Sequence, residues 1–236
     1  MDHPRKEVRA TISELIRVPV AGGALIGELE APTQARALVL FAHGSGSSRH
    51  SPRNRMVAAE LRTARLGTVL VDLLTDSEGR EDLATGVHRF DIELLGRRVT
   101  AVVDWLTAEP DLSGLPLVLF GASTGAAAAL VAAAERPDRV LTVVSRGGRP
   151  DLAQAALSRV RAPVLLVVGG RDPQVLRLNE QAARRLRAPH ALRVVPDATH
   201  LFEEPGALEE VAAATKEWCD DRLRALRGER GRHAVP

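Results

Sequence analysis

A five-residue pattern, Gly-x-Ser-x-Gly, occupies residues 121–125 and constrains the fold more than any other feature of the sequence. The apolar residues 117–120 before it predict a buried strand, and the alanine-rich residues 126–135 after it predict a helix. A serine in a tight turn between strand and helix has a strained backbone and an exposed hydroxyl. Gly121 and Gly125 give this turn room, because a side chain at either position would collide with neighbouring backbone. The context predicts Ser123 as a nucleophile, whereas an incidental serine in a glycine-rich loop is the simpler alternative.

Short apolar runs alternate with helical patterns along the rest of the chain, which predicts a single α/β domain over residues 11–227. Two β-prone runs flank Ala21-Gly22-Gly23 and predict an antiparallel hairpin. The later strands follow helices, so the sheet is expected to be mostly parallel and doubly wound. The further predicted strands are 35–42, 68–73, 140–144, 163–168 and 192–195, and the further helices are 52–65, 89–108, 174–186 and 205–226, with a short helix after Pro150. We expect residues 74–88 to form an irregular excursion that serves as a minimal cap, and residues 1–10 and 228–236 to be flexible tails.

The composition argues against several classes of function. The 32 Lys and Arg nearly balance the 30 Asp and Glu, and no basic block stands out, so nucleic-acid binding is not indicated. Residues 1–10 are charged, and no apolar run reaches the length of a membrane span. The single cysteine, Cys219, allows no disulfide within the chain and is expected to face the core, which suits a reducing, cytoplasmic compartment. A small-molecule partner is expected, with no metal or cofactor and no membrane, and a homodimer stays open.

A nucleophilic serine needs a base, and His200 is the best candidate. It directly follows the last predicted strand, and the carboxyl ends of parallel strands meet at one edge of a sheet. His190 precedes that strand and belongs at the opposite edge. The other histidines lie in loops or tails: His3, His43, His50, His88 and His233.

The base needs an orienting acid, and Asp172 is the best candidate. It follows a predicted strand within a glycine-proline turn, and it lies between Ser123 and His200 in the chain. Asp72, at the end of an earlier strand, is a reserve, and Asp197 is too near His200 in sequence to fold back on it. Each residue alone has an ordinary explanation as a turn former, helix cap or surface side chain. The order Ser, Asp, His on successive strand ends, however, matches one known arrangement of a catalytic triad.

The motifs together resemble those of the α/β-hydrolases, and more narrowly those of the small dienelactone-hydrolase-like group. The resemblance covers about residues 14–225 and rests on His43-Gly44-Ser45-Gly46, the serine turn at 121–125, Gly-Gly-x-Asp at 169–172, and His200. It implies a single-domain α/β-hydrolase fold with Ser123 as nucleophile, His200 as general base and then acid, and Asp172 as orienter. It also implies an oxyanion hole made by the backbone N–H groups of Ser45 and Thr124.

Two departures from the family pattern limit what this resemblance implies. Dienelactone hydrolases proper resemble one another in having a cysteine nucleophile, where this chain has Ser123. They also place an arginine shortly after the catalytic histidine to hold the substrate carboxylate, where residues 201–204 read Leu-Phe-Glu-Glu. The dienelactone substrate therefore does not carry over. Gly46 and Arg146 are the candidate substrate-binding residues; Arg146 and Arg149 could hold an anionic group, although solvated surface arginines are the simpler interpretation.

These observations predict a serine hydrolase that cleaves a carboxylic ester, thioester or lactone of a small acyl substrate through an acyl-enzyme intermediate. An acyltransferase with the same catalytic residues and a non-catalytic binding module on the same fold are the alternatives. Aromatic residues make up only 3% of the chain, and residues 74–88 carry few large apolar side chains. We therefore expect a shallow, open site that prefers short acyl groups.

Overall fold

Strand β5 (Leu117–Ala122) runs through the sheet with all its residues buried, as the apolar run predicts. The computed structural model describes residues 11–233, so the predicted tail 1–10 lies outside the described residues. The sheet has eight strands in the order β1-β2-β4-β3-β5-β6-β7-β8. The other strands are β1 (Thr11–Val20), β2 (Gly23–Pro32), β3 (Ala37–Ala42), β4 (Leu66–Val71), β6 (Val140–Arg146), β7 (Val164–Gly169) and β8 (His190–Val195).

The sheet is mixed only at its N-terminal edge. Strand β1 pairs antiparallel with β2 around the turn at residues 21–22, and β2 pairs antiparallel with β4. All the pairings from β4 through β3, β5, β6 and β7 to β8 are parallel. The predicted fold class is therefore confirmed, including its N-terminal hairpin.

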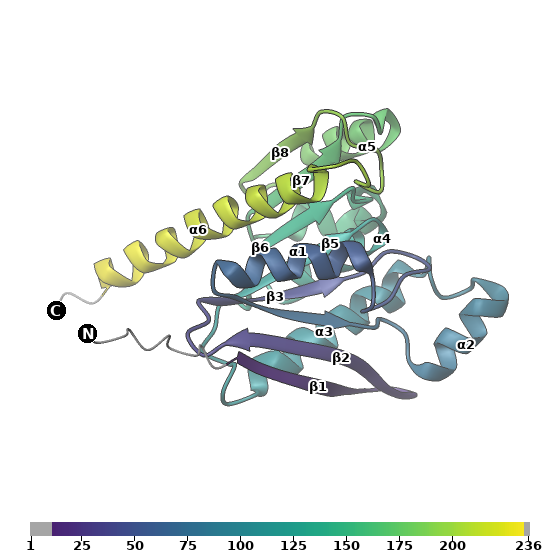
Figure 1. The fold of residues 1–236 in the computed structure, drawn as a ribbon, viewed down its shortest axis with the longest axis horizontal. Coiled ribbons are helices and arrows are strands. Elements are labelled where there is room, and N and C mark those ends of the chain that lie inside the picture. Colours follow the sequence, from purple (N-terminus) through teal and green to yellow (C-terminus); the bar gives the residue numbers. More distant parts are fainter. Residues whose placement is uncertain (1–10, 234–236) are drawn as a thin grey trace, which may run out of the picture.

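Helices cover both faces of the sheet (Figure 1). They are α1 (Pro52–Thr63), α2 (Asp76–Thr85), α3 (Ile92–Ala108), α4 (Thr124–Glu135), the 3₁₀ segment η1 (Pro150–Arg159), α5 (Pro173–Ala183) and α6 (Ala207–His233). One apolar core lies between the sheet and α3, α4, η1 and α5, and a second lies between the sheet and α1 and α6. The small side chains of α4 let it pack closely on the sheet, and nearly all of that helix is buried.

Two segments differ from the sequence prediction. Residues 76–85 form helix α2 where an irregular excursion was expected, because Thr75 and Glu78 make a capping box that begins the helix. Helix α6 continues to His233, past the predicted end at residue 226 and into the stretch assigned to the tail, and residues 234–236 lie outside the described part. Among residues 11–233, no helix combines the length and apolar character needed to cross a membrane.

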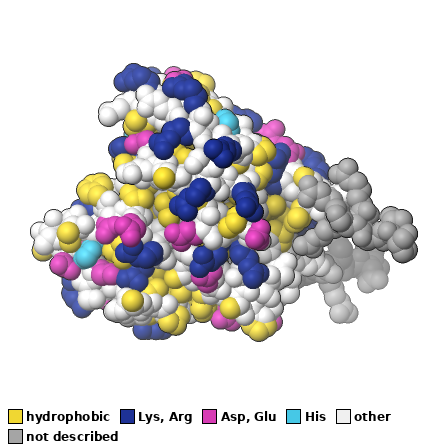
Figure 2. Space-filling view, turned by 180° about the vertical axis from the view of Figure 1, so that it is seen from behind, with side chains coloured by type: hydrophobic (Ala, Val, Ile, Leu, Met, Phe, Trp, Pro, Cys, Tyr) yellow, Lys and Arg dark blue, Asp and Glu magenta, His cyan; other side chains and the backbone are white. Residues whose placement is uncertain are grey.

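Charged side chains of both signs share the surface. On the face shown in Figure 2, Lys and Arg side chains are interspersed with Asp and Glu and do not form a single continuous stripe. Ion pairs join charged side chains elsewhere along the chain, for example Arg136 with Asp104 and Arg193 with Glu217.

Candidate active site

The serine turn after β5 and the loop after β3 lie side by side at the topological switch point of the sheet, where the order of successive strands reverses. Strand β3 leads through α1 to β4 on one side, and β5 leads through α4 to β6 on the other. Loops that diverge in this way leave a crevice at the carboxyl ends of the two strands, where ligands bind in open α/β sheets. The contact is close here, since a Cβ added to Gly44 would lie 3.0 Å from Ser123 Cβ.

Ser123 is held in a strained backbone conformation by its neighbours. Its φ is 51° and its ψ is −122°, in a region that non-glycine residues rarely occupy. A Cβ on Gly121 would lie 2.3 Å from Ala126 Cα, and one on Gly125 would lie 2.2 Å from the carbonyl oxygen of Ala42. Ser123 stands at the N-cap of α4 but makes no side-chain capping bond, so its hydroxyl is not used by the helix.

Asp172 and His200 lie together at the ends of β7 and β8. Asp172 Oδ2 is 2.7 Å from His200 Nδ1, and Asp172 Oδ1 accepts a bond from the backbone N–H of Val175 at 3.2 Å. The same carboxylate therefore caps α5 and contacts the imidazole. Because an ionised carboxylate only accepts, the contact places the imidazole proton on Nδ1 and leaves Nε2 with a free lone pair.

The two other acids considered in the sequence lie apart from His200. Asp72 directly follows β4 and accepts bonds from the backbone N–H and the guanidinium of Arg49, which tie it to the loop after β3. The side chain of Asp197 is 89% exposed, and its partner is Arg171 at 3.9 Å. The structure thus brings Asp172, and neither alternative, to the imidazole.

Backbone contacts fix the distance between the loops that carry this pair. The N–H of Gly170 donates to Val195 O at 2.8 Å, and the N–H of Arg171 donates to Ala198 O at 2.9 Å. A Cβ on Gly169 would lie 2.3 Å from Ala198 O, so only glycine allows the loops to approach this closely. The Gly-Gly sequence before Asp172 therefore has a geometric role.

Ser123 and His200 line one cavity of about 230 Å³. Its wall is formed by Gly44, Ser45, Ser47, Ser51, Arg53, Asn54, Ala122, Ser123, Arg146, Gly147, His200 and Leu201. No hydrogen bond joins the side chains of Ser123 and His200 among the contacts of the described residues. Catalytic hydrogen bonds are often long before substrate binds, so their common place in one cavity is the relevant observation.

The predicted oxyanion donors are adjacent, but one of them is engaged. The backbone N–H of Ser45 donates to Thr124 Oγ1 at 2.8 Å. The N–H of Thr124 belongs to the first turn of α4, where helix N–H groups lack partners within the helix. A substrate oxygen placed here would accept a hydrogen bond from the Thr124 N–H directly. To accept one from the Ser45 N–H as well, it would have to share this N–H with the Thr124 hydroxyl or displace the hydroxyl.

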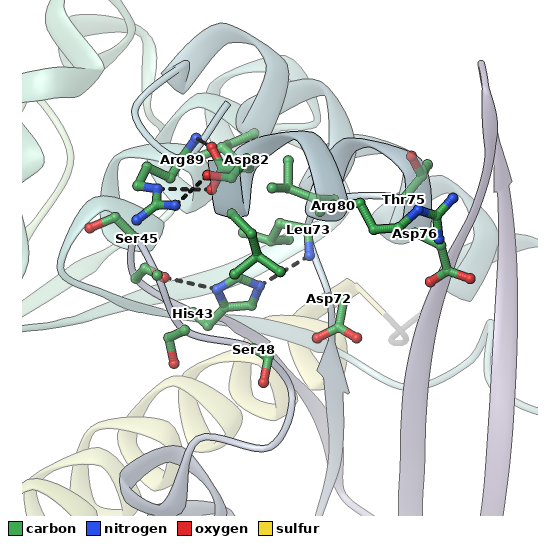
Figure 3. A pocket seen from close by; sticks show the side chains of 17 residues that line it. His43, Ser45, Ser48, Asp72, Leu73, Thr75, Asp76, Arg80, Asp82 and Arg89 are labelled. Carbon is green, nitrogen blue, oxygen red and sulfur yellow. Dashed lines mark hydrogen bonds and ion pairs between the residues drawn. The ribbon is translucent and has the colours of Figure 1, made fainter. Parts of the chain in front are cut away.

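Figure 3 shows a second, larger cavity of about 480 Å³. It adjoins the first along the shared residues Gly44, Ser45 and Ser47. Gly46 lines this cavity and not the one that contains Ser123. Leu73, Leu74, Leu83 and Leu95 contribute apolar wall, and α2 lies over it. Nothing in the sequence indicated this second cavity, and the expectation of a shallow, open acyl site stays a prediction.

His43 directly follows β3 and lines this second cavity, close to the end of β4 (Figure 3). Its Nε2 lies 3.1 Å from the backbone N of Leu73, which donates to it, so Nδ1 carries the proton and donates to Gly44 O at 2.9 Å. Burial lowers the pKa of His43, which keeps the ring neutral. The ring thereby ties the loop with Ser45 to the end of β4, a role that its place beside the glycines did not reveal.

Polar anchors hold α2 over the second cavity. Glu78 forms the capping box with Thr75 and also pairs with Arg98 of α3. At the other end Asp82 accepts bonds from the backbone and the guanidinium of Arg89, at 2.8 Å each. The Thr-x-x-Glu sequence at 75–78 was the signal that sequence reasoning missed.

Arg146 and Arg149 have different surroundings. Arg149 pairs with Asp151 at 2.8 Å beside the serine turn. Arg146 is only 6% exposed and lines the Ser123 cavity, so its interpretation as a solvated surface arginine is wrong.

The acidic run after His200 has structural partners. Phe202 is buried with a φ of 56°, and its ring packs beneath Arg146. Glu203 pairs with Arg53 at 3.1 Å, and Glu204 accepts a bond from the backbone N–H of Thr199 at 3.0 Å. These contacts hold the His200 loop and occupy both carboxylates.

Other reactive side chains lie away from this site. Cys219 is buried in the core against α1 and the sheet, and burial raises the pKa of its thiol to about 12. In the described part of the chain, no group of three or more His, Cys, Asp or Glu side chains is arranged to hold a metal ion.

Comparison with known proteins assigns the family. The sequence model of the dienelactone hydrolase family matches residues 72–227, which include Ser123, Asp172 and His200. The chain belongs to the dienelactone hydrolase family. A solved structure described as dienelactone hydrolase from Anabaena variabilis ATCC 29413 is 54% identical, with a TM-score of 0.86 over 88% of this chain and 96% of that one. Est1E from Butyrivibrio proteoclasticus shares the fold with a TM-score of 0.74 at 16% identity, over 89% and 99% of the two chains.

A longer relative carries a different name. The Mycobacterium tuberculosis protein "Putative phosphoribosyl transferase Rv0571c" is 54% identical over 206 residues, which are 87% of this chain and 44% of that protein. This chain therefore spans less than half the length of that relative. The likeness covers these 206 residues and leaves the rest of the longer protein uncompared.

Proposed function

We propose that the chain is a serine hydrolase that cleaves a carboxylic ester, thioester or lactone of a small acyl substrate through an acyl-enzyme intermediate. The observation that carries the proposal is the 2.7 Å contact between Asp172 Oδ2 and His200 Nδ1, in the site where the strained Ser123 lines the same cavity as His200. Membership of a hydrolase family supports the same class of reaction.

The geometry suits general-base catalysis by His200 during acylation. The Nδ1–H of His200 donates a hydrogen bond to Asp172, so Nε2 can take the proton of Ser123 while Oγ attacks the carbonyl carbon, and the carboxylate stabilises the imidazolium that forms. The N–H groups of Thr124 and Ser45 would donate to the carbonyl oxygen as it gains charge, and one such donor is typically worth about 3 kcal/mol. His200 then gives its proton to the leaving alcohol or thiol.

Water completes the reaction in the reverse sense. It enters the position that the alcohol left, gives its proton to His200 Nε2, and attacks the acyl carbon. Collapse of the second tetrahedral intermediate breaks the bond to Ser123 Oγ and returns the proton to the serine. No cofactor enters any of these steps, and a small ester is the expected partner.

Covalent labelling tests the proposal directly. We expect a fluorophosphonate probe to modify Ser123 in the wild type, as read by mass spectrometry of the labelled peptide. Ser123→Ala should abolish labelling and lower ester turnover by roughly 10⁴–10⁶. A folded alanine variant with near-normal turnover would contradict the assignment of the nucleophile.

Two alternatives make different predictions. An acyltransferase would use the same residues and differ only in the acceptor, so added alcohols would raise product formation above that with water alone. A binding module would leave Ser123 unlabelled. The phosphoribosyl transfer named for the longer relative is not proposed for this chain, because the residues assembled here suit acyl chemistry.

A further inference from the structure

Arg146 is buried beside the proposed nucleophile. It ends β6 opposite Ala122 of β5, and its carbonyl oxygen accepts the backbone N–H of Ser123 at 3.2 Å. Its side chain is directed toward α1, where it lines the cavity shared by Ser123 and His200. The guanidinium therefore lies in the wall of the site and not on the outer surface.

No carboxylate of the described residues pairs with this buried charge. Its Nη2 donates to Asn54 Oδ1 at 3.3 Å, its Nε has no hydrogen-bond partner, and its guanidinium carbon lies 5.6 Å from the centre of the Phe202 ring. Arg98, the other buried arginine of the described residues, has Glu78 as an ion-pair partner. Burial of a charge is costly unless an opposite charge compensates it. The described residues supply no such charge for Arg146, so its guanidinium can pair with an anionic group of a ligand.

The opposite wall of the cavity also favours an anion. Ser51 and Asn54, at the N-terminus of α1, line the cavity, and the first turn of that helix has no acidic residue. A helix N-terminus carries partial positive charge and attracts oxyanions. In α1, Pro52 has no N–H and the N–H of Asn54 donates to Ser51 Oγ, so this turn contributes its partial charge and the Asn54 side chain. Arg53, which pairs with Glu203, adds a second guanidinium at this end, and burial together with the charge of Arg53 lowers the pKa of Arg146 to about 10.

We propose that Arg146, Asn54 and the N-terminal turn of α1 bind an oxyanion of the substrate, so that the natural ester also carries a carboxylate or a phosphate. The inference rests on the proposed function and adds the substrate class. The two helix N-termini then have separate tasks. That of α4 receives charge that develops on the reacting carbonyl, and that of α1 receives charge that the substrate carries throughout.

Matched substrates test the proposal. The monoester 4-nitrophenyl adipate carries a free carboxylate, whereas 4-nitrophenyl hexanoate has the same number of acyl carbons and no charge. If the anion belongs to the acyl part, wild-type kcat/KM should be at least tenfold higher for the adipate ester, mainly through a lower KM. Free adipate and inorganic phosphate, at constant ionic strength with chloride as control, should compete with the hexanoate ester, and the stronger of the two identifies the oxyanion.

Two variants of Arg146 separate binding from structure. In Arg146→Met and Arg146→Gln, the adipate-to-hexanoate ratio and the competition by both anions should fall at least tenfold. The melting temperature of Arg146→Met without ligand should be unchanged or higher, because an uncompensated buried charge has been replaced by an apolar side chain. Arg149→Gln is the matched control, since Arg149 lies in the same strand-end loop but pairs with Asp151, and it should keep the wild-type ratio.

Several outcomes would overturn the inference. One is a wild type that shows neither a preference for the adipate ester nor competition by either anion, which decides the matter even if no variant folds. Another is a folded Arg146 variant that keeps the wild-type preference and competition. If no ester is cleaved and Ser123 is not labelled, the proposed function fails by itself, and anion binding is read from the rise in melting temperature with phosphate or adipate and its loss in Arg146→Met.

Discussion

Asp172 performs two tasks with two oxygens, and one substitution separates them. Its Oδ1 caps α5 through the N–H of Val175, and its Oδ2 contacts His200 Nδ1. In Asp172→Asn, the amide oxygen can keep the cap, because asparagine is as good an N-cap as aspartate. The amide NH₂ group then faces Nδ1 and favours the tautomer with the proton on Nε2, which cannot accept the proton of Ser123.

The expected magnitudes differ between activity and stability. The wrong tautomer should lower kcat/KM for a short ester by about 10⁴, which is about 5.5 kcal/mol in the activation free energy. The free energy of unfolding should fall by less than about 1 kcal/mol, since only the favourable charge at the helix N-terminus is lost. Asp172→Ala also removes the cap, so it should lose about 1 kcal/mol more stability and shift the melting temperature by a further 2–4 °C, approximately.

The assay measures hydrolysis of 4-nitrophenyl butyrate together with urea unfolding for three variants. Asp72→Asn is the matched control, because Asp72 is bound to Arg49 on the opposite side of the site. A mild effect of Asp172→Asn with a 10⁴-fold effect of Asp72→Asn would refute the assignment of the orienting acid. A large stability loss in Asp172→Asn would refute the claim that the two tasks are separable.

Three further predictions concern the surroundings of this pair. Gly125→Ala should destabilise the fold by about 3 kcal/mol or prevent folding, because its Cβ would lie 2.2 Å from Ala42 O, whereas Gly114→Ala, with no atom within 4 Å, should fold normally in the same thermal melts. As the pH drops from about 7 to 5, the free energy of unfolding should fall more steeply in the wild type than in His43→Gln, by at most about 1.4 kcal/mol per pH unit. The reason is that burial lowers the pKa of His43 in the folded protein, so below the ordinary pKa of 6.5 unfolding takes up a proton. Equal slopes in the two proteins would contradict this. Over a series of 4-nitrophenyl esters, kcat/KM should fall beyond roughly six to eight acyl carbons. Burial stabilises each methylene by about 0.8 kcal/mol, and methylenes that stay in water gain none of it. A kcat/KM that rises through the dodecanoyl ester would show that acyl chains reach the second cavity.

The sequence was informative wherever a residue's position along the chain determines its place in the sheet. Parallel strands bring their carboxyl ends to one edge, so Ser123, Asp172 and His200 could be expected to lie near one another before any contact was known. The same reasoning placed His190 away from them, and it is the first residue of β8. Such inferences need only the order of strands and helices.

The features that were missed depend on contacts between distant segments. Helix α2 has few apolar residues, so periodicity gave no signal, and its stability comes from the cap at Thr75 and the anchors Arg98 and Arg89. The burial of Arg146 requires Phe202, 56 residues later, to adopt a positive φ and pack its ring beneath the guanidinium. The bond from Ser45 to the Thr124 hydroxyl likewise joins two loops that are 79 residues apart.

The way in which the site is held suggests which parts of it can change independently. The distance between Asp172 and His200 is set by backbone bonds from Gly170 and Arg171 to the loop after β8, and these do not involve α1, α2 or Arg146. The cover of the second cavity depends on ion pairs of α2, and the proposed anion subsite depends on α1 and Arg146. Substitutions in α2 should therefore alter which esters are accepted without moving Asp172 or His200, because no hydrogen bond of the described residues connects α2 to Asp172 or to the His200 imidazole. The proposed anion subsite is less independent, since Arg146 packs on Phe202 and Arg53 of α1 pairs with Glu203, both in the loop that carries His200. On this basis, the cover of the second cavity can change separately from the proposed catalytic residues, whereas changes at the anion subsite also bear on the His200 loop.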